Sequence, residues 1–373
     1  MNHGWEKKRL GDVCDIYQPK TISTKDLVEG GEYDVFGANG IIGKYNSYNH
    51  EESEVLLTCR GATCGTINVS KPKSWINGNA MVVHPTTTKL LKPYLQIVLK
   101  SVDYTGVITG AAQPQITRTS LEPVRILIPT VEKQEQIVSE LGKINELIAA
   151  KRSQLKDLDA LAQSLFYETF GDPLENSKRW NVGTLSEYAN FKNGLNFTPA
   201  DDGNKIKCLG VGDFKSNRYI KTENLPEINI VEAVSEEYRL KDGDIILVRS
   251  NGNKALIGRS IMYVSDNSLA TFSGFCIRCR YNREKLAPLF LSYYLSCGAI
   301  REYITSQGRG CNISNLNQKI LSGIPLILPP LSLQNEFAEK IEAIEEQKRL
   351  IESSIANLET LLASRMDYWF NEI

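Results

Sequence analysis

Two runs of heptad spacing constrain the fold of this chain more than any other feature. In residues 137–165 and again in residues 337–365, seam positions recur at alternating steps of four and three, which places them on one stripe of an α-helix. The first run contains no proline and is followed by Gly171 and Pro173, a typical helix end. One such run alone is equally consistent with an ordinary amphipathic core helix. Two matched runs predict a pair of helices that form a coiled coil.

The seam of each helix is mainly apolar, so the two helices are expected to bury each other. Lys151 and Lys348 fall on the seam near its middle, and we expect their ammonium groups to reach outward to water. Because the chain from Gly171 to Trp180 is short, the second helix can cover the first only by running antiparallel to it. The apolar seam positions considered are Ile137, Leu141, Ile144, Ile148, Leu155, Leu158, Phe337, Ile341, Ile344, Ile351, Ile355 and Leu358.

An internal repeat accompanies the two helices. Residues 5–16 match residues 180–191 in the placing of Trp, Leu and further apolar residues, at an offset of 175. Residues 124–129 match residues 324–329 at an offset of 200. The chain is therefore a duplicated arrangement of lobe and helix, in which the second lobe is about 25 residues longer.

Each lobe contains short strand-like and helix-like segments, which favours α/β (mixed α+β) lobes. We expect two globular lobes, residues 1–130 and 171–329, separated by a long antiparallel two-helix coiled coil of residues 131–170 and 330–373 with a pseudo-twofold internal repeat. Residues 37–45 are expected to form a Gly-rich turn. The expected strands are residues 55–58, 67–69, 81–84, 125–128, 244–249, 260–264, 275–281 and 325–328, and the expected short helices are residues 92–101 and 286–296.

Charge and hydropathy limit the functions that the chain can have. Residues 1–130 carry 14 Lys and Arg against 12 Asp and Glu, residues 181–329 carry 18 against 14, and both helical regions are acidic. This charge distribution is compatible with lobes that bind phosphate groups and helices that do not. No apolar run is long enough to span a membrane and no signal peptide is present, so we expect a cytoplasmic protein without a membrane partner.

No motif for catalysis or metal binding is recognisable. The chain has three His and eight Cys, and the pair Cys276 and Cys279 lacks a second pair, so we expect buried cysteines and no zinc site. Residues 37–45 lack the spacing of a phosphate-binding loop, and the Asn-Pro-Pro-Tyr or Asp-Pro-Pro-Tyr loop of amino-methyltransferases is missing. We therefore expect no catalytic residues and no cofactor or metal in this chain.

Fork-shaped polar side chains beside glycines are the best candidates for a binding function. Arg, Asn and Gln can read purine edges through paired hydrogen bonds, and glycine lets the backbone come close. The alternative is that these segments are ordinary surface loops. The candidates for DNA binding are Arg60, Thr63, Gln113, Gln115 and Arg118 in the first lobe, and Arg249, Asn251, Asn253, Lys254, Gln307, Arg309 and Asn312 in the second.

The order of several motifs resembles the specificity subunit of type I restriction–modification systems over essentially the whole chain. The motifs are residues 37–43 (GANGIIG), 75–80 (WINGNA), 109–117 (TGAAQPQIT) and 166–173 (FYETFGDP), and an Ile-Pro pair that leads to Gln134. The chain departs slightly from the family pattern at the helix starts. Pro-Thr-Val follows Ile128 in place of Pro-Pro-Leu, and Asn335 follows Gln334.

The resemblance implies a subunit without catalysis. Residues 1–130 and 171–329 would be target-recognition domains, each reading one half of a split, asymmetric site in double-stranded DNA. The spacer helices, residues 131–170 and 330–373, would dock two methyltransferase subunits that carry S-adenosylmethionine and methylate adenine at N6, and two restriction subunits can join for cleavage. The 28 steps from Ile137 to Leu165 would separate the lobes by about 42 Å, on the order of 12 base pairs.

Two alternatives stay open from the sequence. The chain could serve a type IIB system, whose partner fuses cleavage and methylation, because the sequence of a specificity subunit does not distinguish the two systems. It could also be a coiled-coil scaffold that binds no DNA. The missing methyltransferase loop argues against a single-chain modification enzyme.

Overall fold

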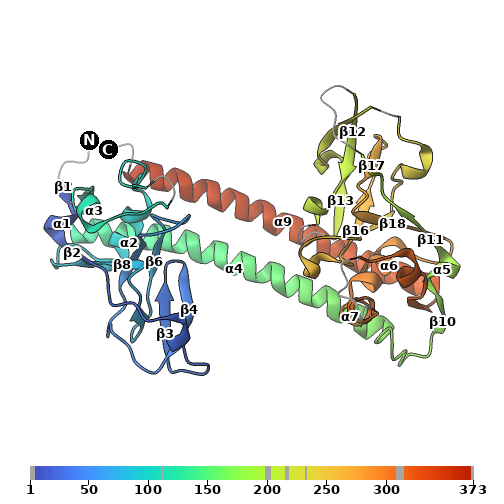
Figure 1. Ribbon diagram of the computed structural model, residues 1–373, viewed down its shortest axis with the longest axis horizontal. Coiled ribbons are helices and arrows are strands. Elements are labelled where there is room, and N and C mark those ends of the chain that lie inside the picture. The colour runs from blue at the N-terminus through green and yellow to red at the C-terminus, as the bar shows by residue number, and fades with distance from the viewer. Residues whose placement is uncertain are drawn as a thin grey trace. The chain divides into compact units, whose positions relative to one another are not determined.

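The computed structural model describes residues 5–110, 113–197, 203–214, 218–231, 233–307 and 315–370 (Figure 1). The chain divides into two compact units. Unit 1 comprises Met1–Arg152 with Ser353–Ile373, and unit 2 comprises Ser153–Glu352. Each unit contains small β-sheets and a part of both long helices, α4 (Val131–Phe170) and α9 (Leu331–Phe370).

The described residues of unit 1 form three small sheets. Strands β1 and β9 form an antiparallel pair in which Glu6 lies opposite Ile128. The other two sheets have the strand orders β2-β8-β5-β6 and β4-β3-β7. The elements before α4 are β1 (Glu6–Arg9), α1 (Leu10–Val13), β2 (Cys14–Tyr17), β3 (Tyr33–Gly37), β4 (Gly40–Tyr45), β5 (Val55–Thr58), β6 (Ile67–Val69), β7 (Trp75–Ile76), β8 (Ala80–Pro85), α2 (Lys92–Lys100), α3 (Arg118–Leu121) and β9 (Arg125–Ile128).

Unit 2 repeats this plan with additional strands. Strands β10 and β19 form an antiparallel pair, and the other sheets have the orders β11-β18-β15-β16-β13 and β14-β12-β17. The elements between α4 and α9 are β10 (Asn181–Thr184), α5 (Leu185–Tyr188), β11 (Ala189–Asn193), β12 (Asn204–Leu209), β13 (Tyr219–Lys221), β14 (Glu227–Ile230), β15 (Ile245–Val248), β16 (Ser260–Val264), β17 (Ala270–Phe272), β18 (Cys276–Tyr281), α6 (Pro288–Ser296), α7 (Gly298–Ser306), α8 (Gln318–Ser322) and β19 (Pro325–Leu328).

The long helices run antiparallel within unit 1. Arg365 of α9 forms an ion pair with Glu140 of α4, and Arg152 Nη2 lies 2.7 Å from Glu359 Oε1. The numbering rises along one helix as it falls along the other, which only antiparallel helices allow. Lys133 also stacks on the ring of Trp369 near the end of α9, with Nζ 4.6 Å from the ring centroid.

The helices are antiparallel in unit 2 as well, and an aromatic cluster joins them there. Phe170, near the end of α4, lies 4.8 Å from Phe290 of α6 and 5.2 Å from Phe337 of α9 between ring centroids. Aromatic pairs of this kind contribute about 0.5–1.5 kcal/mol each beyond their area burial. The helix α4 ends at this cluster, because Gly171 adopts a φ of +78° that few other residues tolerate.

Lys348 differs from the expectation that its head reaches outward to water. Its Nζ lies 2.8 Å from Asp159 Oδ1 of α4 and 3.2 Å from Glu345 Oε1 of its own helix. Burial alone would lower the pKa of Lys348, but the hydrogen bonds to these two carboxylates more than offset it, and the pKa is raised. The lysine therefore links the two helices in unit 2 through an ion pair.

The seam residues differ in their degree of burial. Buried and partly exposed positions alternate near the middle of the helices, where Ile148 and Ile355 are buried and Leu155 and Ile351 are partly exposed. The buried positions are Ile137, Leu141, Ile144, Ile148, Phe337, Ile341, Ile344 and Ile355, and the partly exposed positions are Leu155, Leu158, Ile351 and Leu358.

The predicted Gly-rich turn of residues 37–45 is present but shorter than expected, because residues 40–45 form the strand β4. Strands β3 and β4 pair across a loop of only two residues, Ala38 and Asn39. The turn is tight because Gly40 supplies a positive φ of +106°. The expected strands at residues 55–58, 67–69, 125–128, 260–264 and 325–328 have the predicted bounds. The other three strands and both short helices are present with ends shifted by one or two residues, whereas β1 to β4, β7, β10 to β14 and β17 were not predicted as strands.

Candidate nucleic-acid interface

Two loops of unit 1 that are distant in the sequence meet beyond the end of β5. Arg60 and Gln115 form an antiparallel β-bridge, and the Gly61 N–H donates to the Pro114 carbonyl at 3.0 Å. The structure thus brings four predicted side chains onto adjacent segments, and all four are exposed: Arg60, Thr63, Gln113 and Gln115.

Two of the candidates of unit 1, Thr63 and Arg118, form side-chain hydrogen bonds within the unit. Thr63 Oγ1 donates to Asn39 Oδ1 at 2.5 Å, so the hairpin loop between β3 and β4 also reaches this surface. Arg118 lies in α3, and its Nε donates to Glu122 Oε1 at 2.7 Å. The guanidinium of Arg118 is thus already paired one turn along the same helix, which makes it a weaker candidate than Arg60.

In unit 2 the loop after β15 carries the corresponding candidates. Arg249 is half-buried, and its Nη1 donates to the Gly274 carbonyl at 3.2 Å, with no further side-chain partner among the described residues. The loop that follows is shaped by its own asparagines. Asn251 Oδ1 accepts from the Asn253 N–H at 2.8 Å, and Asn253 Oδ1 accepts from the Ala255 N–H at 3.1 Å.

These bonds leave the amide NH2 groups of Asn251 and Asn253 available to a ligand, and Lys254 is exposed beside them. Gln307 is exposed just after the end of α7. Arg309 and Asn312 lie outside the described residues, so the structure does not bear on them.

Two further arginines flank this loop and were missed by the sequence motifs. Arg301 Nη2 donates to the Ala255 carbonyl at 3.2 Å, and Arg259 Nη1 donates to the Phe214 carbonyl at 3.4 Å. Burial, and then the positive charge of Arg259, lower the pKa of Arg301. Within the described ranges, no carboxylate forms an ion pair with either guanidinium. Such a site favours an anion, because a bound phosphate would relieve the repulsion between them.

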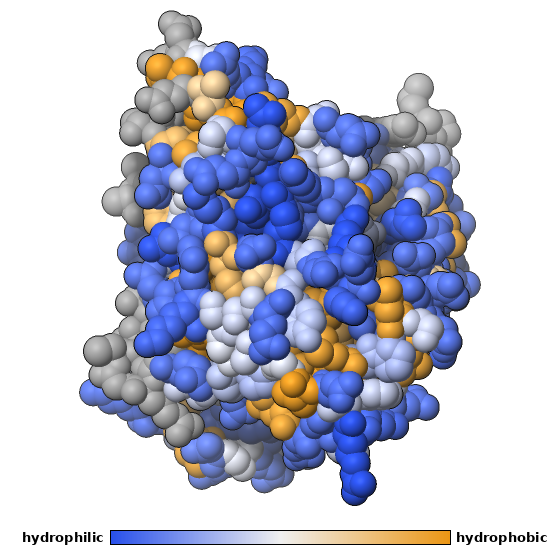
Figure 2. All heavy atoms as spheres, turned by 90° about the vertical axis from the view of Figure 1, so that its right-hand side faces the viewer, coloured by the Kyte–Doolittle hydropathy of each residue, from blue (hydrophilic) through white to orange (hydrophobic). Residues whose placement is uncertain are grey.

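An exposed phenyl ring, Phe275, lies on the turn before β18 and is 61% exposed. Its carbonyl accepts from the backbone N–H of Arg249 at 2.8 Å, so the ring is presented beside the candidate loop. The face of the molecule in Figure 2 is largely hydrophilic, with hydrophobic atoms in separate patches.

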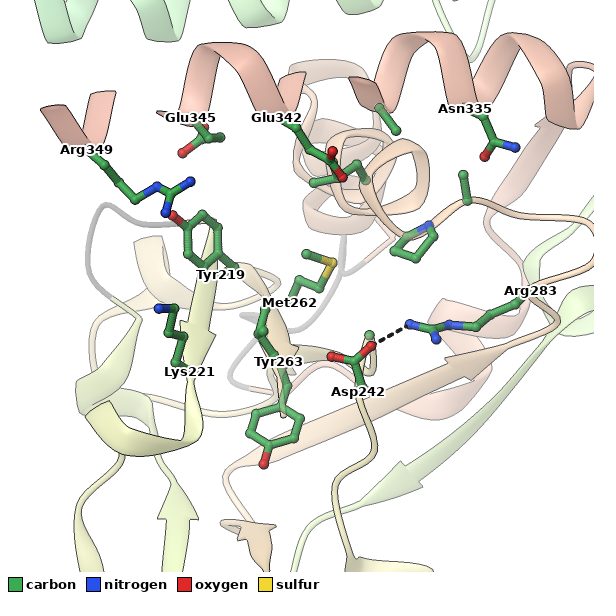
Figure 3. Close-up of a pocket in the computed structure, with 16 residues that line it drawn as sticks. Tyr219, Lys221, Asp242, Met262, Tyr263, Arg283, Asn335, Glu342, Glu345 and Arg349 are labelled. Atoms are coloured by element: carbon green, nitrogen blue, oxygen red, sulfur yellow. Dashed lines mark hydrogen bonds and ion pairs between the residues drawn. The ribbon is translucent and has the colours of Figure 1, made fainter. Parts of the chain in front are cut away.

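Unit 2 also has a cleft of about 560 Å³, which is lined by β13, β16 and α9 (Figure 3). Asp242 and Arg283 are paired at its rim, with Oδ2 and Nη2 3.2 Å apart. Lys221, Glu342 and Arg349 also line it, so charges of both signs face the cavity. It lacks the excess of positive charge that a DNA backbone requires.

The described residues show neither a metal centre nor a membrane span. No group of three or more His, Cys, Asp or Glu in this part of the chain could hold a metal ion, and Cys276 and Cys279 are both buried and free. Burial raises the pKa of both thiols far above the usual range. None of the described helices combines the length and apolar character needed to cross a bilayer.

A family model for the type I restriction modification DNA specificity domain matches residues 2–158 and again residues 177–360. The chain belongs to this family. The two matches correspond to the internal repeat, so this is a DNA specificity subunit with two target-recognition domains, a non-catalytic component of a type I restriction–modification complex.

Full-length relatives have the same description. The chain is 26% identical to the type I restriction enzyme StySPI specificity subunit of Salmonella potsdam, covering 94% of this chain and 74% of that protein. It is 22% identical to the MjaVIII specificity subunit of Methanocaldococcus jannaschii, covering 91% and 86%. The fold matches the crystal structure of a type I system S subunit from M. genitalium with a TM-score of 0.62 at 15% identity, covering 100% and 97%. The alternative of a scaffold without a DNA role does not fit this family.

Proposed function

We propose that each of the two units reads one half of a split, asymmetric site in double-stranded DNA. The observation that carries this proposal is the recurrence of the same arrangement in both units: a loop after the central strand, β5 or β15, with exposed or half-buried Arg or Asn side chains. The candidate base-reading residues are Arg60, Thr63, Gln113 and Gln115 for one half-site, and Arg249, Asn251, Asn253 and Lys254 for the other.

Arg249→Ala is expected to relax the half-site read by unit 2 and to leave the other half-site intact. A paired contact of Arg with a guanine edge provides roughly 1–3 kcal/mol of discrimination, or about 5- to 160-fold between bases. The measurement is methylation by the assembled complex on a library of randomised half-sites. Arg283→Ala is the matched control, because Arg283 pairs with Asp242 away from the loop. Full specificity at both halves in Arg249→Ala would show that another loop reads the bases.

Arg259 and Arg301 are proposed to bind the phosphate backbone and not the bases. Replacing both with Gln is expected to weaken binding to all sequences alike. It is also expected to reduce the slope of log affinity against log salt by about 2, since each phosphate contact contributes about 0.9. Salt titrations of the wild-type and variant complexes on specific and random DNA measure this. An unchanged slope would contradict the assignment.

We further propose the following division of the chain: target-recognition domains at residues 1–130 and 171–329, and spacer helices at residues 131–170 and 330–373. The helices set the spacing of the half-sites and dock two methyltransferase subunits, which supply S-adenosylmethionine. Two restriction subunits join for cleavage, and the complex works in the cytoplasm. A type IIB system, whose partner fuses methylation and cleavage, is the alternative.

Exposed leucines on the helices support two docking surfaces. Leu161 of α4, in unit 2, and Leu361 of α9, in unit 1, occupy equivalent places in the repeat and are 52% and 46% exposed. One exposed leucine is common on a protein surface, so the support comes from the exposure of both leucines at equivalent positions of the repeat. The equivalence of the two leucines predicts one methyltransferase subunit at each.

Leu161→Glu is expected to reduce the number of bound methyltransferase subunits from two to one, and the double variant with Leu361→Glu to none. The reason is the cost of burying an unpaired carboxylate in the interface. Native mass measurement of the complex at saturating partner reports the stoichiometry. Gln163→Glu, at an exposed position of the same helix, is the control and should retain two partners. Two partners bound to Leu161→Glu would refute this docking surface.

A further inference from the structure

The two units share a backbone junction beyond their central strands. In unit 1 the Cys59 N–H donates to the Asn79 carbonyl at 3.1 Å, and the Cys59 carbonyl accepts from the Ile116 N–H at 3.0 Å. In unit 2 the same bonds join Arg249 to Phe275 at 2.8 Å and Leu316 to Arg249 at 2.7 Å. In each case the residue after the central strand is held between the turn before β8 or β18 and the segment before α3 or α8.

The turn at this junction is closely packed in both units. Gly78 donates its N–H to Thr21 Oγ1 at 3.0 Å, and a Cβ at Gly78 would lie only 2.7 Å from the Pro19 carbonyl oxygen. Gly274 donates to the Leu195 carbonyl at 2.8 Å, and a Cβ there would collide with the side chain of the next residue, Asn196. Residues 19–21, which follow β2, pack against the turn at Gly78. Residues 195–196, which follow β11, pack against the turn at Gly274.

The next residue of each turn is presented to solvent, and its chemistry differs between the units. Asn79 is exposed, and its side-chain amide has no hydrogen-bond partner among the described residues. Phe275 is 61% exposed. The same backbone junction therefore presents an amide in unit 1 and a phenyl ring in unit 2. Each of them lies next to the loop whose side chains are the candidates for base reading.

We propose that Asn79 and Phe275 are equivalent specificity-determining residues, Asn79 for an adenine in one half-site and Phe275 for a thymine in the other. This inference depends on the proposed DNA-reading function. An Asn amide matches N6 and N7 of adenine through two hydrogen bonds, and the thymine methyl is the apolar group that the major groove offers to a phenyl ring. The hydrogen bonds of the junction hold the backbone of each residue in place, so less backbone entropy is lost on binding.

The Phe275 assignment is tested by removing single methyl groups from the DNA. Each thymine of the half-site read by unit 2, identified by mapping the methylated sites, is replaced by deoxyuridine in turn. One replacement is expected to weaken binding of the wild-type complex about fourfold, the value of one buried methyl group. Phe275→Ala should bind the thymine and deoxyuridine sites equally. Leu269→Ala removes another exposed apolar side chain of unit 2 and should discriminate like wild type.

The Asn79 assignment is tested with 7-deazaadenine, which lacks the N7 acceptor. One such replacement in the other half-site should weaken wild-type binding about tenfold and leave Asn79→Leu unaffected. Discrimination that persists in Phe275→Ala or Asn79→Leu, or equal wild-type affinity for every modified site, would overturn the inference. If the wild-type complex did not distinguish its mapped site from scrambled DNA, the proposed function would fail as well.

Discussion

Gln334→Ala is expected to lower the free energy of unfolding by about 3–5 kcal/mol, an unusually large effect for a polar residue. Gln334 is fully buried at the start of α9. Its Oε1 accepts from the Ala287 N–H at 2.8 Å, and its Nε2 donates to the carbonyls of Lys285 at 3.0 Å and Pro329 at 2.9 Å. Alanine removes all three bonds, and each backbone group left buried without a partner costs about 1–3 kcal/mol.

Gln134 makes the same three bonds in unit 1, which allows a matched comparison. It accepts from the Leu91 N–H at 2.9 Å and donates to the carbonyls of Lys89 at 2.7 Å and Pro129 at 2.9 Å. Gln134→Ala should therefore destabilise unit 1 to a similar extent.

Urea denaturation gives the size of both effects, and amide hydrogen exchange locates them, at Ala287 in one variant and at Leu91 in the other. Gln347→Ala, at an exposed position of α9, should change stability by less than about 0.5 kcal/mol. A loss below about 1 kcal/mol in Gln334→Ala would mean that water replaces the side chain.

Lengthening both helices by one heptad is expected to weaken binding to the natural DNA site by at least about 100-fold. The insertions go after Arg152 and after Glu352, where the chain passes from one unit to the other, so the contacts within each unit are kept. Seven residues add about 10 Å, or roughly 3 base pairs, and turn a half-site by about a quarter of the duplex circumference. One half-site is then lost, because its contacts are no longer in register.

Selection from DNA with randomised spacers measures the outcome. The lengthened protein should recover binding on sites with the same half-sites and an altered spacer. A variant whose central heptad is replaced by another of equal length and apolar spacing is the control, and should keep the natural spacer. Undiminished methylation of the natural site by the lengthened protein would show that the helices do not set the spacing.

The two long helices and the repeat could be predicted from the sequence because both depend on the spacing of residues along the chain. The period of apolar residues specifies a helix wherever its stripe can be buried, and Gly171 ends α4 through its own backbone freedom. The matched ends of the lobes correspond to the strand pairs β1–β9 and β10–β19. The candidate loops were found for a similar reason, since Arg60 and Arg249 stand beside recognisable polar runs.

What only the tertiary structure decided is which distant residues share a surface. The bridge between Arg60 and Gln115 and the contact of Arg249 with the turn at Phe275 depend on strand pairing across long stretches of chain, which no local pattern encodes. Lys348 was assigned to water from the sequence because its partner Asp159 is 189 residues away. Phe275 and Arg301 went unnoticed for the same reason. Exposure, burial and ion pairing are properties of the packed chain, whereas periodicity is a property of neighbouring residues.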